Sequence, residues 1–544
     1  MSATESLPVS AHHPKAAATR VLVADNLDPA GVELLREAGL DVDVQMGLSP
    51  EELAVAAKNA HGILVRSAAK VTADVIAAAP QLRAVGRAGI GVDNIDLDAA
   101  SERGVLVMNT PLANATTTAE LAIAHLFGLA RHLARANQSM VEGRWDKKKL
   151  VGHELTGKTL CVVGLGKIGR LVAERGVGLK MKVIAHDPFL QGESPVQGVE
   201  LVSFDDALKR ADYLTLHVPK GANTAGLINA DALAQMKPSA ALINCARGGI
   251  VVEADLVAAL SDGKLAGAAL DVFETEPLPE DSPLRAVPNL LMTPHLGASS
   301  SEAQVRVSTE IAAQMIDYLL KGEARCAVNA PSVAPELLAK LRPFMQLGGC
   351  LGRMVGQLAA SPVVKLEVSY VGELAELETD PLRREVLAGL LSIGREAPVN
   401  AVNAERVADD RGLKVLEERT RKGSDYTALL KLNAFTADGT EHVLAGTVWR
   451  GQPRLAVFEG FGVDFRPEGT LLVTRHLDQP GVLGQVATWL GTIDVNIGGL
   501  HMAAAGHAGE PALAVFETDR ALTTDEQKAL RELPPIVSTC VLQV

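Results

Sequence analysis

The sequence predicts an α/β fold in which two units with parallel sheets are followed by two smaller mixed units. From Arg20 onward, short runs rich in β-branched residues alternate with helical patterns, and a second series of this kind begins at residue 157. Parallel strands are joined by crossovers that are usually helices, so this alternation indicates parallel sheets covered on both faces. Beyond residue 360 the apolar residues alternate with period two, which indicates half-buried strands. A chain of 544 residues is long enough for about three to five domains.

The expected elements up to residue 331 follow one another in a regular order. The first unit has strands at 21–25, 42–45 and 62–67, each followed by a helix. A long alanine-rich helix over about Thr117–Ala136 leads into the second unit, and another over about Ser300–Leu320 closes it. The expected strand regions of the second unit begin at residue 157 and continue at 182–188, 211–219, 239–249, 265–273 and 290–298.

Two further units are expected after a proline-rich linker at 329–336. The region 332–468 alternates at 363–374 and 428–436 and is expected to be an α+β domain. The region 469–544 has the order βαββαβ, a split βαβ sandwich. Its expected elements are a strand at 470–475, a helix at 483–491, strands at 495–503 and 512–518, a helix at 523–532 and a strand at 536–543.

The composition excludes several classes of function. Acidic residues outnumber basic ones by 65 to 52, which gives a net charge of −13, and only 3% of the residues are aromatic. Such a chain repels nucleic-acid phosphates and anionic lipids, and it lacks the aromatic residues of a base-stacking platform. No nucleic-acid or membrane partner is therefore expected, and an anionic ligand would need a local cluster of basic residues.

The cysteines and the N-terminal residues bear on the cellular compartment. The five cysteines are scattered, without CxxC or metal-ligand spacing, so reduced thiols, a cytoplasmic location and no metal site are expected. No stretch reaches the ~18 uncharged apolar residues of a membrane span, and residues 1–18 lack the apolar core of a secretory signal. Residues 1–18 are expected to form a flexible tail, with an organellar transit peptide as the alternative.

A glycine-rich turn follows the strand-like residues at 160–163. Its glycines are Gly164, Gly166 and Gly169, and Lys167 and Ile168 stand between the last two. The first glycine permits a tight turn, the second lets a pyrophosphate approach the backbone, and the third allows close packing of helix on strand. With a strand before it and a helix after it, the motif predicts a dinucleotide at the helix N-terminus.

An acidic residue stands at the end of the next strand. Asp187 lies 18 residues after Gly169, where a carboxylate can accept hydrogen bonds from both hydroxyls of the adenosine ribose. The same negative charge would repel the 2′-phosphate of NADP, so the predicted cofactor is NAD. An ordinary turn acid before Pro188 is the alternative interpretation.

Several motifs occur together in the order and spacing of a known family. They are RSAAKVTADVI (66–76), VGRAGIGVDNID (85–96), VMNTP (107–111), GLGKIG (164–169), NCARGGIV (244–251), AALDVFETEP (268–277) and PHLGAS (294–299). With them the chain resembles the D-isomer-specific 2-hydroxyacid dehydrogenases, and most closely the long phosphoglycerate dehydrogenase branch. The resemblance implies a Rossmann-like NAD-binding domain (114–296) inserted in a flavodoxin-like substrate domain (19–113 and 297–331), followed by the intervening domain at 332–468.

The resemblance assigns catalysis to Arg247, Glu276 and His295. A histidine titrates in the range needed to take the hydroxyl proton when a hydride leaves a carbinol carbon. A carboxylate on the other ring nitrogen fixes the tautomer and stabilises the imidazolium that forms. A guanidinium can hold a substrate carboxylate in two parallel hydrogen bonds and polarise the neighbouring carbonyl. A surface arginine and a structural histidine are the alternatives for Arg247 and His295.

Residues 61–92 carry four basic residues against one acid, which is a local excess of positive charge. A substrate with a phosphate at one end and a carboxylate at the other needs such a second anchor. Arg83 in this segment is expected to be structural. By resemblance the substrate contacts are Arg66, Lys70, Arg87, Gly89, Arg247 and His295.

The resemblance extends the cofactor site beyond the glycine turn. Cys245, which has no evident base partner in the sequence, is interpreted as a small buried thiol lining the nicotinamide pocket. Ile90 stands where many relatives have a hydroxyl residue near the cofactor. The implied cofactor contacts outside the turn are Asp187, Cys245, Ala246, Arg247, Asp271, His295, Gly297 and Ala298.

The region 469–544 resembles an ACT domain, the small amino-acid-sensing fold. Its matching residues include DQPGVL (478–483), in which Pro480 and Gly481 set a turn into a helix start with free amides. By resemblance Asp478 and Asn496 bind an amino-acid effector, L-serine, between paired domains. A purely oligomeric module is the alternative.

The resemblance implies NAD-dependent oxidation of 3-phospho-D-glycerate to 3-phosphooxypyruvate, at the entry to L-serine biosynthesis, by a homotetramer. Two alternatives stay open. One is a reductase of glyoxylate, hydroxypyruvate or 2-oxoglutarate on the same scaffold. The other is a nucleotide-sensing corepressor. The complete Arg, Glu and His set and the ACT region argue against this alternative.

Overall fold

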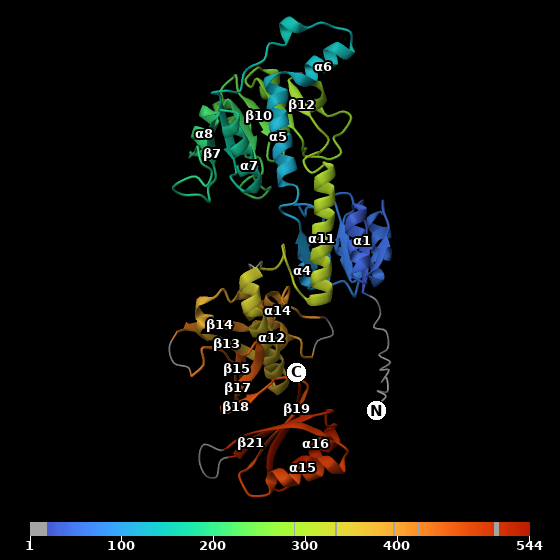
Figure 1. Cartoon of the computed structure of the whole chain (residues 1–544), viewed down its shortest axis with the longest axis vertical. Helices are drawn as coiled ribbons and strands as arrows, with labels where there is room; N and C mark the ends of the chain where they lie inside the picture. The colour runs from blue at the N-terminus through green and yellow to red at the C-terminus, as the bar shows by residue number, and fades with distance from the viewer. Residues whose placement is uncertain (1–18, 288, 332–334, 395–397, 422–424, 505–510) are drawn as a thin grey trace, which may run out of the picture.

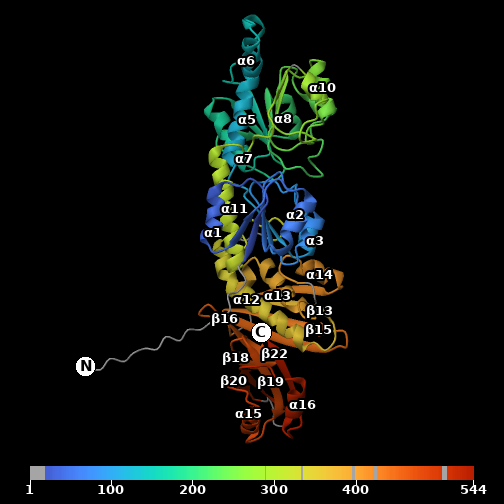
Figure 2. The same cartoon turned by 90° about the vertical axis from the view of Figure 1, so that its right-hand side faces the viewer.

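The computed structural model describes residues 19–287, 289–331, 335–394, 398–421, 425–504 and 511–544. Four units, each built around one sheet, follow one another along the long axis of the molecule (Figures 1 and 2). The order in space is not that of the chain, because the first unit lies between the second unit and the two C-terminal units. The tail expected at 1–18 lies outside the described residues.

The first unit is a five-stranded parallel sheet in the order β2-β1-β3-β4-β5. This is the flavodoxin-like order, so the predicted fold of the unit is confirmed. Two of its strands, β4 and β5, were not among the predicted ones, because a buried four-residue run carries no periodicity. The strands are β1 (Arg20–Val23), β2 (Asp41–Val44), β3 (Gly62–Val65), β4 (Ala84–Arg87) and β5 (Leu106–Asn109).

Helices cover both faces of the first sheet, and one of them comes from far along the chain. Asp28 caps α1 and a Ser49–Glu52 capping box begins α2, each just before a proline at the first helical position. Helix α11 returns to pack on α1 and β4 through buried residues such as Ile311 and Met315. The helices are α1 (Pro29–Glu37), α2 (Pro50–Ala56), α3 (Ala73–Ala78), α4 (Leu97–Glu102) and α11 (Ser301–Lys321).

The second unit is a seven-stranded parallel sheet in the order β12-β11-β10-β9-β6-β7-β8. The chain reverses its direction of winding between β6 and β9, which opens a crevice at the carboxyl ends of the strands. This confirms the predicted Rossmann-like fold. The strands are β6 (Thr159–Val163), β7 (Lys182–His186), β8 (Val199–Leu201), β9 (Tyr213–Leu216), β10 (Ala241–Asn244), β11 (Gly267–Leu270) and β12 (Leu290–Met292). The helices are α5 (Ala115–Ala130), α7 (Lys167–Gly178), α8 (Phe204–Arg210), α9 (Ala230–Gln235) and α10 (Glu253–Ser261).

The strands of the second unit are shorter than expected. The region 239–249, for example, is a strand only from Ala241 to Asn244. The residues that follow leave the sheet at its carboxyl edge, as do those after β7 and β11. These loops carry most of the predicted site residues. In the sequence, each apolar strand segment is therefore followed directly by polar or charged residues of the site.

The long helix expected over about Thr117–Ala136 is wrong, because the structure divides it in two. Helix α5 ends at Ala130, and α6 begins at Leu133 and runs to Val141. Between them His132 has a left-handed backbone (φ 51°), which no right-handed helix can contain. Helix α5 stays on the sheet, whereas α6 projects away from it at the end of the molecule (Figure 1).

The third unit has a mixed six-stranded sheet in the order β14-β13-β15-β16-β17-β18, parallel only between β13 and β14. Helices α12 and α13 pack closely together because small residues face each other; a Cβ on Gly389 would lie 2.2 Å from the Gly349 carbonyl oxygen. The helices are α12 (Pro335–Leu358), α13 (Asp380–Leu391) and α14 (Ala404–Asp410). The strands are β13 (Val363–Gly372), β14 (Lys414–Thr420), β15 (Ala428–Thr436), β16 (Glu441–Trp449), β17 (Gln452–Phe458) and β18 (Phe461–Phe465).

The linker predicted at 329–336 is only partly a linker. Its first residues belong to the first unit, since the Asn329 side chain bonds to Val105 and Val107 at the edge of that sheet. Helix α12 already begins at Pro335, and residues 332–334 lie outside the described residues.

The fourth unit has an antiparallel sheet in the order β20-β21-β19-β22 and confirms the predicted βαββαβ order. One face packs on its own helices through residues such as Phe516, and the other packs on the third unit through residues such as Leu513. The elements are β19 (Thr470–Leu477), α15 (Val482–Thr492), β20 (Ile497–Ala503), β21 (Pro511–Thr518), α16 (Thr524–Arg531) and β22 (Ile536–Gln543).

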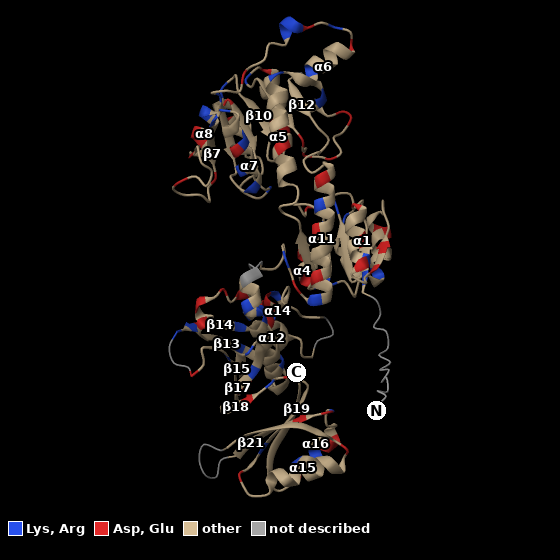
Figure 3. Ribbon diagram, in the orientation of Figure 1, with Lys and Arg blue, Asp and Glu red and all other residues tan. Residues whose placement is uncertain are grey.

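Charged residues of both signs occur in all four units (Figure 3). The excess negative charge of the chain is therefore spread out, and a local basic cluster must be sought at particular residues. Among the helices that the structure describes, none combines the length and the apolar character that a membrane-spanning segment requires.

Candidate active site

A cleft of about 780 Å³ lies between the first and second units. The first unit contributes Arg66 and Arg87, from the carboxyl ends of β3 and β4. The second unit contributes Glu276 and His295, from the loops after β11 and β12. Both sheets thus point their carboxyl edges at one cleft, where loops gather and ligands bind in parallel α/β folds.

The His295 imidazole and the Glu276 carboxylate form a hydrogen-bonded pair. His295 Nδ1 lies 2.6 Å from Glu276 Oε2, and Glu276 Oε1 accepts a hydrogen bond from the Phe273 amide at 3.0 Å. The glutamate is therefore held at both oxygens, and it orients the ring through Nδ1. With Nδ1 engaged, Nε2 is the nitrogen left to exchange a proton with a ligand in the cleft.

The loop that carries His295 is held by a buried carboxylate. His295 has a left-handed backbone (φ 54°), which costs a residue other than glycine about 1–3 kcal/mol. Asp271, fully buried after β11, accepts hydrogen bonds from the Thr293 hydroxyl (2.5 Å) and the amides of Leu296 (2.7 Å) and Gly297 (2.8 Å). These contacts offset the strain. They show Asp271 as the support of the loop at residues 293–297, and its predicted cofactor contact stays a prediction.

Arg247 reaches from the second unit to the first. Its Nη1 donates to the Ala246 carbonyl at 2.7 Å, and its Nε lies 3.4 Å from the Asp93 carboxylate. The guanidinium packs against Gly91. A Cβ at that position would lie 2.2 Å from Arg247 Nη2, so the absence of a side chain leaves room for the arginine. The guanidinium therefore sits where the two units meet.

Arg87 is a partly buried cation without a full set of partners. Burial lowers the pKa of its guanidinium to about 10, and the positive charges of Arg247 and Arg66 act in the same direction. Its buried Nε has no hydrogen-bond partner among the described residues. At Gly89 (φ 144°) a Cβ would lie 1.4 Å from Arg87 Nη1, so the backbone leaves room for the guanidinium. An anion in the cleft would relieve the repulsion between these arginines.

Of the remaining basic residues in segment 61–92, only some line the cleft. Arg66 lines the cleft and is steadied by a hydrogen bond from its Nη1 to the Asn26 carbonyl at 3.0 Å. Lys70 is exposed and is not among the residues that line the cleft, so the structure does not bring it together with Arg66 and Arg87. Arg83 donates to the Leu319 carbonyl on α11, in keeping with its expected structural role.

The glycine turn has the shape that a dinucleotide requires. Gly164 has φ +90°, and a Cβ on Gly169 would lie 1.9 Å from the Gly164 carbonyl oxygen. A Cβ on Gly166 would instead meet open space, so the backbone at the second glycine is accessible. Helix α7 begins directly after it without a side-chain cap, which leaves its first amides for a ligand. Lys167 and Ile168 form the first turn of α7.

Asp187 lies beside this turn, at the end of β7. Its Oδ2 accepts a hydrogen bond from the Leu165 amide at 2.8 Å, and its Oδ1 accepts one from the Phe189 amide at 3.0 Å. The carboxylate is thus placed against the glycine turn, as the predicted ribose contact requires. Glycine turn, free helix start and acid together fit NAD.

Comparison with known proteins agrees with this geometry. Residues 123–297 match the profile described as D-isomer specific 2-hydroxyacid dehydrogenase, NAD binding domain, and residues 340–458 match the D-3-phosphoglycerate dehydrogenase intervening domain. The chain is 42% identical to D-3-phosphoglycerate dehydrogenase of Synechocystis sp. over 502 residues, which cover 92% of this chain and 90% of that protein. It is 39% identical to D-3-phosphoglycerate dehydrogenase of Methanocaldococcus jannaschii over 528 residues, 96% of this chain and 100% of that protein. The chain belongs to the D-3-phosphoglycerate dehydrogenase family.

A solved structure extends the comparison to the fold of more than half of the chain. NAD-dependent formate dehydrogenase from Staphylococcus aureus, in complex with NAD, is similar over 58% of this chain and 100% of its own, with 29% identity and a TM-score of 0.52. Membership of the D-3-phosphoglycerate dehydrogenase family confirms the resemblance predicted from the motifs and the assignment to NAD-dependent oxidoreductases.

The structure of this family member adds one residue that sequence reasoning missed. His125, on α5, lies 3.4 Å from Cys245 Sγ through Nδ1 and 3.2 Å from Thr293 Oγ1 through Nε2. The only signal was a lone polar residue on an apolar helix face, which is usually structural. Cys245 therefore has a base neighbour after all, but burial raises the pKa of its thiol, which agrees with a neutral lining residue.

The other predicted cofactor contacts lie around the same loops. Ala298 lines the cleft, and the Gly297 carbonyl accepts a hydrogen bond from the Thr118 hydroxyl at 2.8 Å. Ala246 directly precedes Arg247, and its amide donates to the Asn244 side chain. The Ile90 carbonyl accepts a hydrogen bond from the Asn109 amide group at 2.6 Å. The contacts of Ala246, Gly297 and Ala298 with NAD remain predictions, whereas Ile90 was noted only as lacking the hydroxyl that many relatives have near the cofactor.

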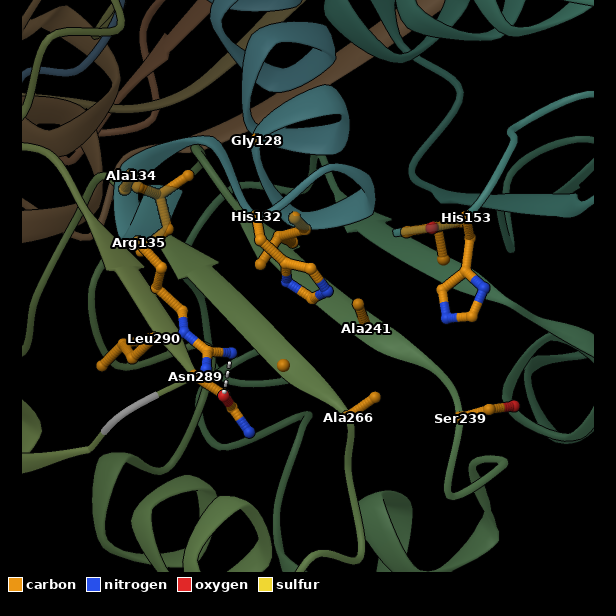
Figure 4. A pocket seen from close by; sticks show the side chains of 14 residues that line it. Gly128, His132, Ala134, Arg135, His153, Ser239, Ala241, Ala266, Asn289 and Leu290 are labelled. Atoms are coloured by element: carbon orange, nitrogen blue, oxygen red, sulfur yellow. Dashed lines mark hydrogen bonds between the residues drawn. The ribbon is translucent and has the colours of Figure 1, made fainter. Parts of the chain in front are cut away.

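A smaller cavity, of about 100 Å³, lies at the opposite edge of the second sheet (Figure 4). Ala241, Gly267 and Leu290, at the amino ends of their strands, line it together with His132 and Arg135. Because ligands of parallel α/β sheets bind at the carboxyl edge, this cavity does not belong to the active site.

The two predicted effector residues are exposed and lie at opposite ends of the fourth sheet. Leu477, just before Asp478, pairs with Pro511 at the start of β21, whereas Ile497, just after Asn496, pairs with Thr518 at its end. An effector within one copy of this domain therefore cannot touch both side chains. Strand direction decides this, and the local motif carries no information about it.

Proposed function

We propose that this chain oxidises 3-phospho-D-glycerate to 3-phosphooxypyruvate with NAD, the first step of L-serine biosynthesis. The observation that carries the proposal is that Arg66 and Arg87 line a cleft that also holds the His295–Glu276 pair, while Arg247 lies close enough for its positive charge to act on Arg87. A substrate with a phosphate at one end and a carboxylate at the other can pair with this positive charge, whereas a substrate with a carboxylate alone leaves part of the charge unpaired.

The residues of the cleft divide the reaction between them. Neutral His295 accepts the hydroxyl proton at Nε2 as the C–O bond becomes a carbonyl, and Glu276 stabilises the imidazolium that results. Arg247 holds the carboxylate in two hydrogen bonds and polarises the developing carbonyl. Arg66 and Arg87 bind the phosphate. NAD, when bound over the glycine turn and Asp187, supplies the acceptor for the hydride that leaves the carbinol carbon.

A panel of substrates tests this proposal against its alternatives. We expect kcat/KM for 3-phosphoglycerate to exceed that for unphosphorylated D-glycerate by at least about tenfold, because charge-assisted hydrogen bonds are worth about 1.5–3 kcal/mol each. Reduction of NAD should also exceed that of NADP. Replacing Arg87 with Gln should lower the ratio of kcat/KM for 3-phosphoglycerate to kcat/KM for D-glycerate.

The other outcomes identify the alternatives. Equal kcat/KM for glyoxylate, hydroxypyruvate or 2-oxoglutarate, assayed in the direction of reduction, would assign a reductase of unphosphorylated acids. Absence of any NAD or NADP reduction would revive the corepressor interpretation.

Assembly and regulation form the second part of the proposal. We propose a cytoplasmic homotetramer in which L-serine binds between paired fourth units and inhibits. Two copies paired in opposite directions would place Asp478 of one beside Asn496 of the other, which one copy alone does not do. Exposed apolar residues at the end of α6 and just after it, such as Val141 and Trp145, support association of copies.

Sedimentation and initial rates test assembly and regulation together. We expect a tetrameric mass by analytical ultracentrifugation and a lower rate of NADH formation when L-serine is added. Asp478→Ala and Asn496→Ala should each abolish the effect of serine, whereas Asp525→Asn, on the same unit, should keep it. A monomeric mass, or serine inhibition that survives both substitutions, would contradict the proposed site.

A further inference from the structure

A chain of four side chains runs beneath the catalytic loop. Cys245 Sγ lies 3.4 Å from His125 Nδ1, His125 Nε2 lies 3.2 Å from Thr293 Oγ1, and Thr293 Oγ1 lies 2.5 Å from Asp271 Oδ1. Cys245, His125 and Asp271 are each no more than 5% exposed. The four residues come from four separate parts of the second unit: helix α5, the loop of Arg247, the loop of Glu276 and the loop of His295.

The hydrogen bonds of this chain have a determined direction. The Thr293 hydroxyl has one proton, which it donates to the Asp271 carboxylate, so toward His125 it must accept. His125 therefore carries its proton on Nε2, and its unprotonated Nδ1 accepts from the Cys245 thiol. All donors point the same way, from the thiol to the carboxylate.

The alternative, a thiolate facing an imidazolium, is disfavoured by the surroundings. Burial raises the pKa of the Cys245 thiol, and the nearby Asp271 charge raises it further. Burial also lowers the pKa of the His125 imidazole, against a smaller opposite effect of Asp271. Both groups are thus neutral, and the chain is a scaffold and no nucleophilic dyad.

The chain ends on the group that holds His295 in place. Asp271 also accepts the amides of Leu296 and Gly297, so its position determines the path of residues 293–297. Its partner Thr293 lies two residues before His295, in the same turn as the strained histidine. A shift of Thr293 would therefore be transmitted to the catalytic imidazole.

We propose that His125 is a positioning residue for His295, which it orients through Thr293 and Asp271. This inference rests on the proposed function, in which His295 takes the hydroxyl proton. Small displacements of reacting groups cost rate out of proportion to binding. Loss of the His125–Thr293 hydrogen bond should therefore lower kcat and leave KM for NAD nearly unchanged.

Three substitutions at residue 125 separate the two arms of the imidazole. His125→Leu removes both hydrogen bonds. His125→Gln places an amide nitrogen near Nε2 and keeps the bond to Thr293, whereas His125→Asn places an amide near Nδ1 and keeps only the bond to Cys245. We expect kcat to fall about tenfold in the Leu and Asn variants and to recover to within about threefold of the unaltered chain in the Gln variant.

The infrared S–H stretching band of Cys245 reports on the other hydrogen bond, between the thiol and His125 Nδ1, and its measurement needs no catalytic turnover. Cys245→Ala assigns the band of this thiol by difference. We expect the band to shift toward that of a free thiol in the Leu and Gln variants and to stay in place in the Asn variant. A purely structural role of His125 would not produce these opposite patterns in kcat and in the thiol band.

The controls keep the inference distinct from the proposed function. His442→Leu removes another buried histidine, bonded to Glu459 in the third unit, and should leave kcat unchanged. If the His125→Leu variant does not fold, Thr293→Val breaks the same chain and should also lower kcat at constant KM for NAD. Unchanged kcat in the Leu variant, equal kcat in the Asn and Gln variants, or an unshifted band would overturn the inference. Absence of 3-phosphoglycerate oxidation by the unaltered chain would instead overturn the proposed function.

Discussion

Replacing His295 with Gln is expected to lower kcat for 3-phosphoglycerate by at least about 10², because proton transfer by a positioned side chain contributes about 10²–10⁴. Glutamine fills similar space and places its amide near the position of Nε2, whereas Glu276 lies 2.6 Å from Nδ1. It cannot accept a proton near neutral pH. Binding of NADH, which depends on the glycine turn and Asp187, should stay close to that of the unaltered chain. Initial rates of NADH formation and a fluorescence titration with NADH measure the two quantities.

A double variant and a matched control sharpen this test. In a chain that already carries His295→Gln, the further change Glu276→Gln should cost little, because the carboxylate acts through the imidazolium. His153→Gln, at the cavity on the opposite edge of the sheet, should leave kcat unchanged. Retained turnover in the His295→Gln variant would remove His295 from its role, and additive losses would separate Glu276 from it.

Replacing Arg247 with Lys should lower kcat/KM for 3-phosphoglycerate by about 10². Lysine keeps the charge but presents no planar pair of donors, so it loses one charge-assisted hydrogen bond, worth about 1.5–3 kcal/mol, and the bidentate geometry. Most of the loss should appear in kcat, since the second hydrogen bond also polarises the carbonyl that forms. Steady-state kinetics with varied 3-phosphoglycerate at saturating NAD measure it.

The control for the Arg247 substitution is an arginine outside the cleft that holds a carboxylate with two hydrogen bonds. Arg210 makes two hydrogen bonds to the Glu200 carboxylate, at 2.7 and 2.6 Å, on the surface of the second unit. Arg210→Lys should leave kcat/KM unchanged. If the Arg247→Lys variant were equally unaffected, a point charge would suffice at this position and bidentate binding of the carboxylate would be wrong.

Local patterns predicted the elements whose signals are contiguous in the chain. The glycine turn, with Asp187 at a set distance, needs only a strand, a turn and a helix in succession, and the structure has all three. The βαββαβ order of residues 469–544 was predicted for the same reason. The error at 117–136 arose because alanine-rich residues favour helix on both sides of His132, while only the tertiary fold makes the chain leave the sheet there.

The candidate site was predicted unevenly. Arg247, Glu276 and His295 were identified by resemblance, and the structure places Glu276 and His295 in direct contact. Lys70 was grouped with Arg66 and Arg87 because the three are close in the sequence, yet it does not line the cleft. Asp478 and Asn496 were expected to share an effector, and the direction of the strands places them at opposite ends of a sheet.

The sequence alone was thus sufficient for the kind of chemistry, the cofactor type and the order of the domains. These depend on residue types at short, regular spacings. The tertiary structure alone decided that Arg87 is partly buried close to Arg66 and Arg247, and that His125 joins Thr293 to Cys245. Thr293 is 168 residues from His125 in the chain, and whether such residues meet depends on sheet order and burial. No local pattern encodes these, because they arise only when distant segments pack.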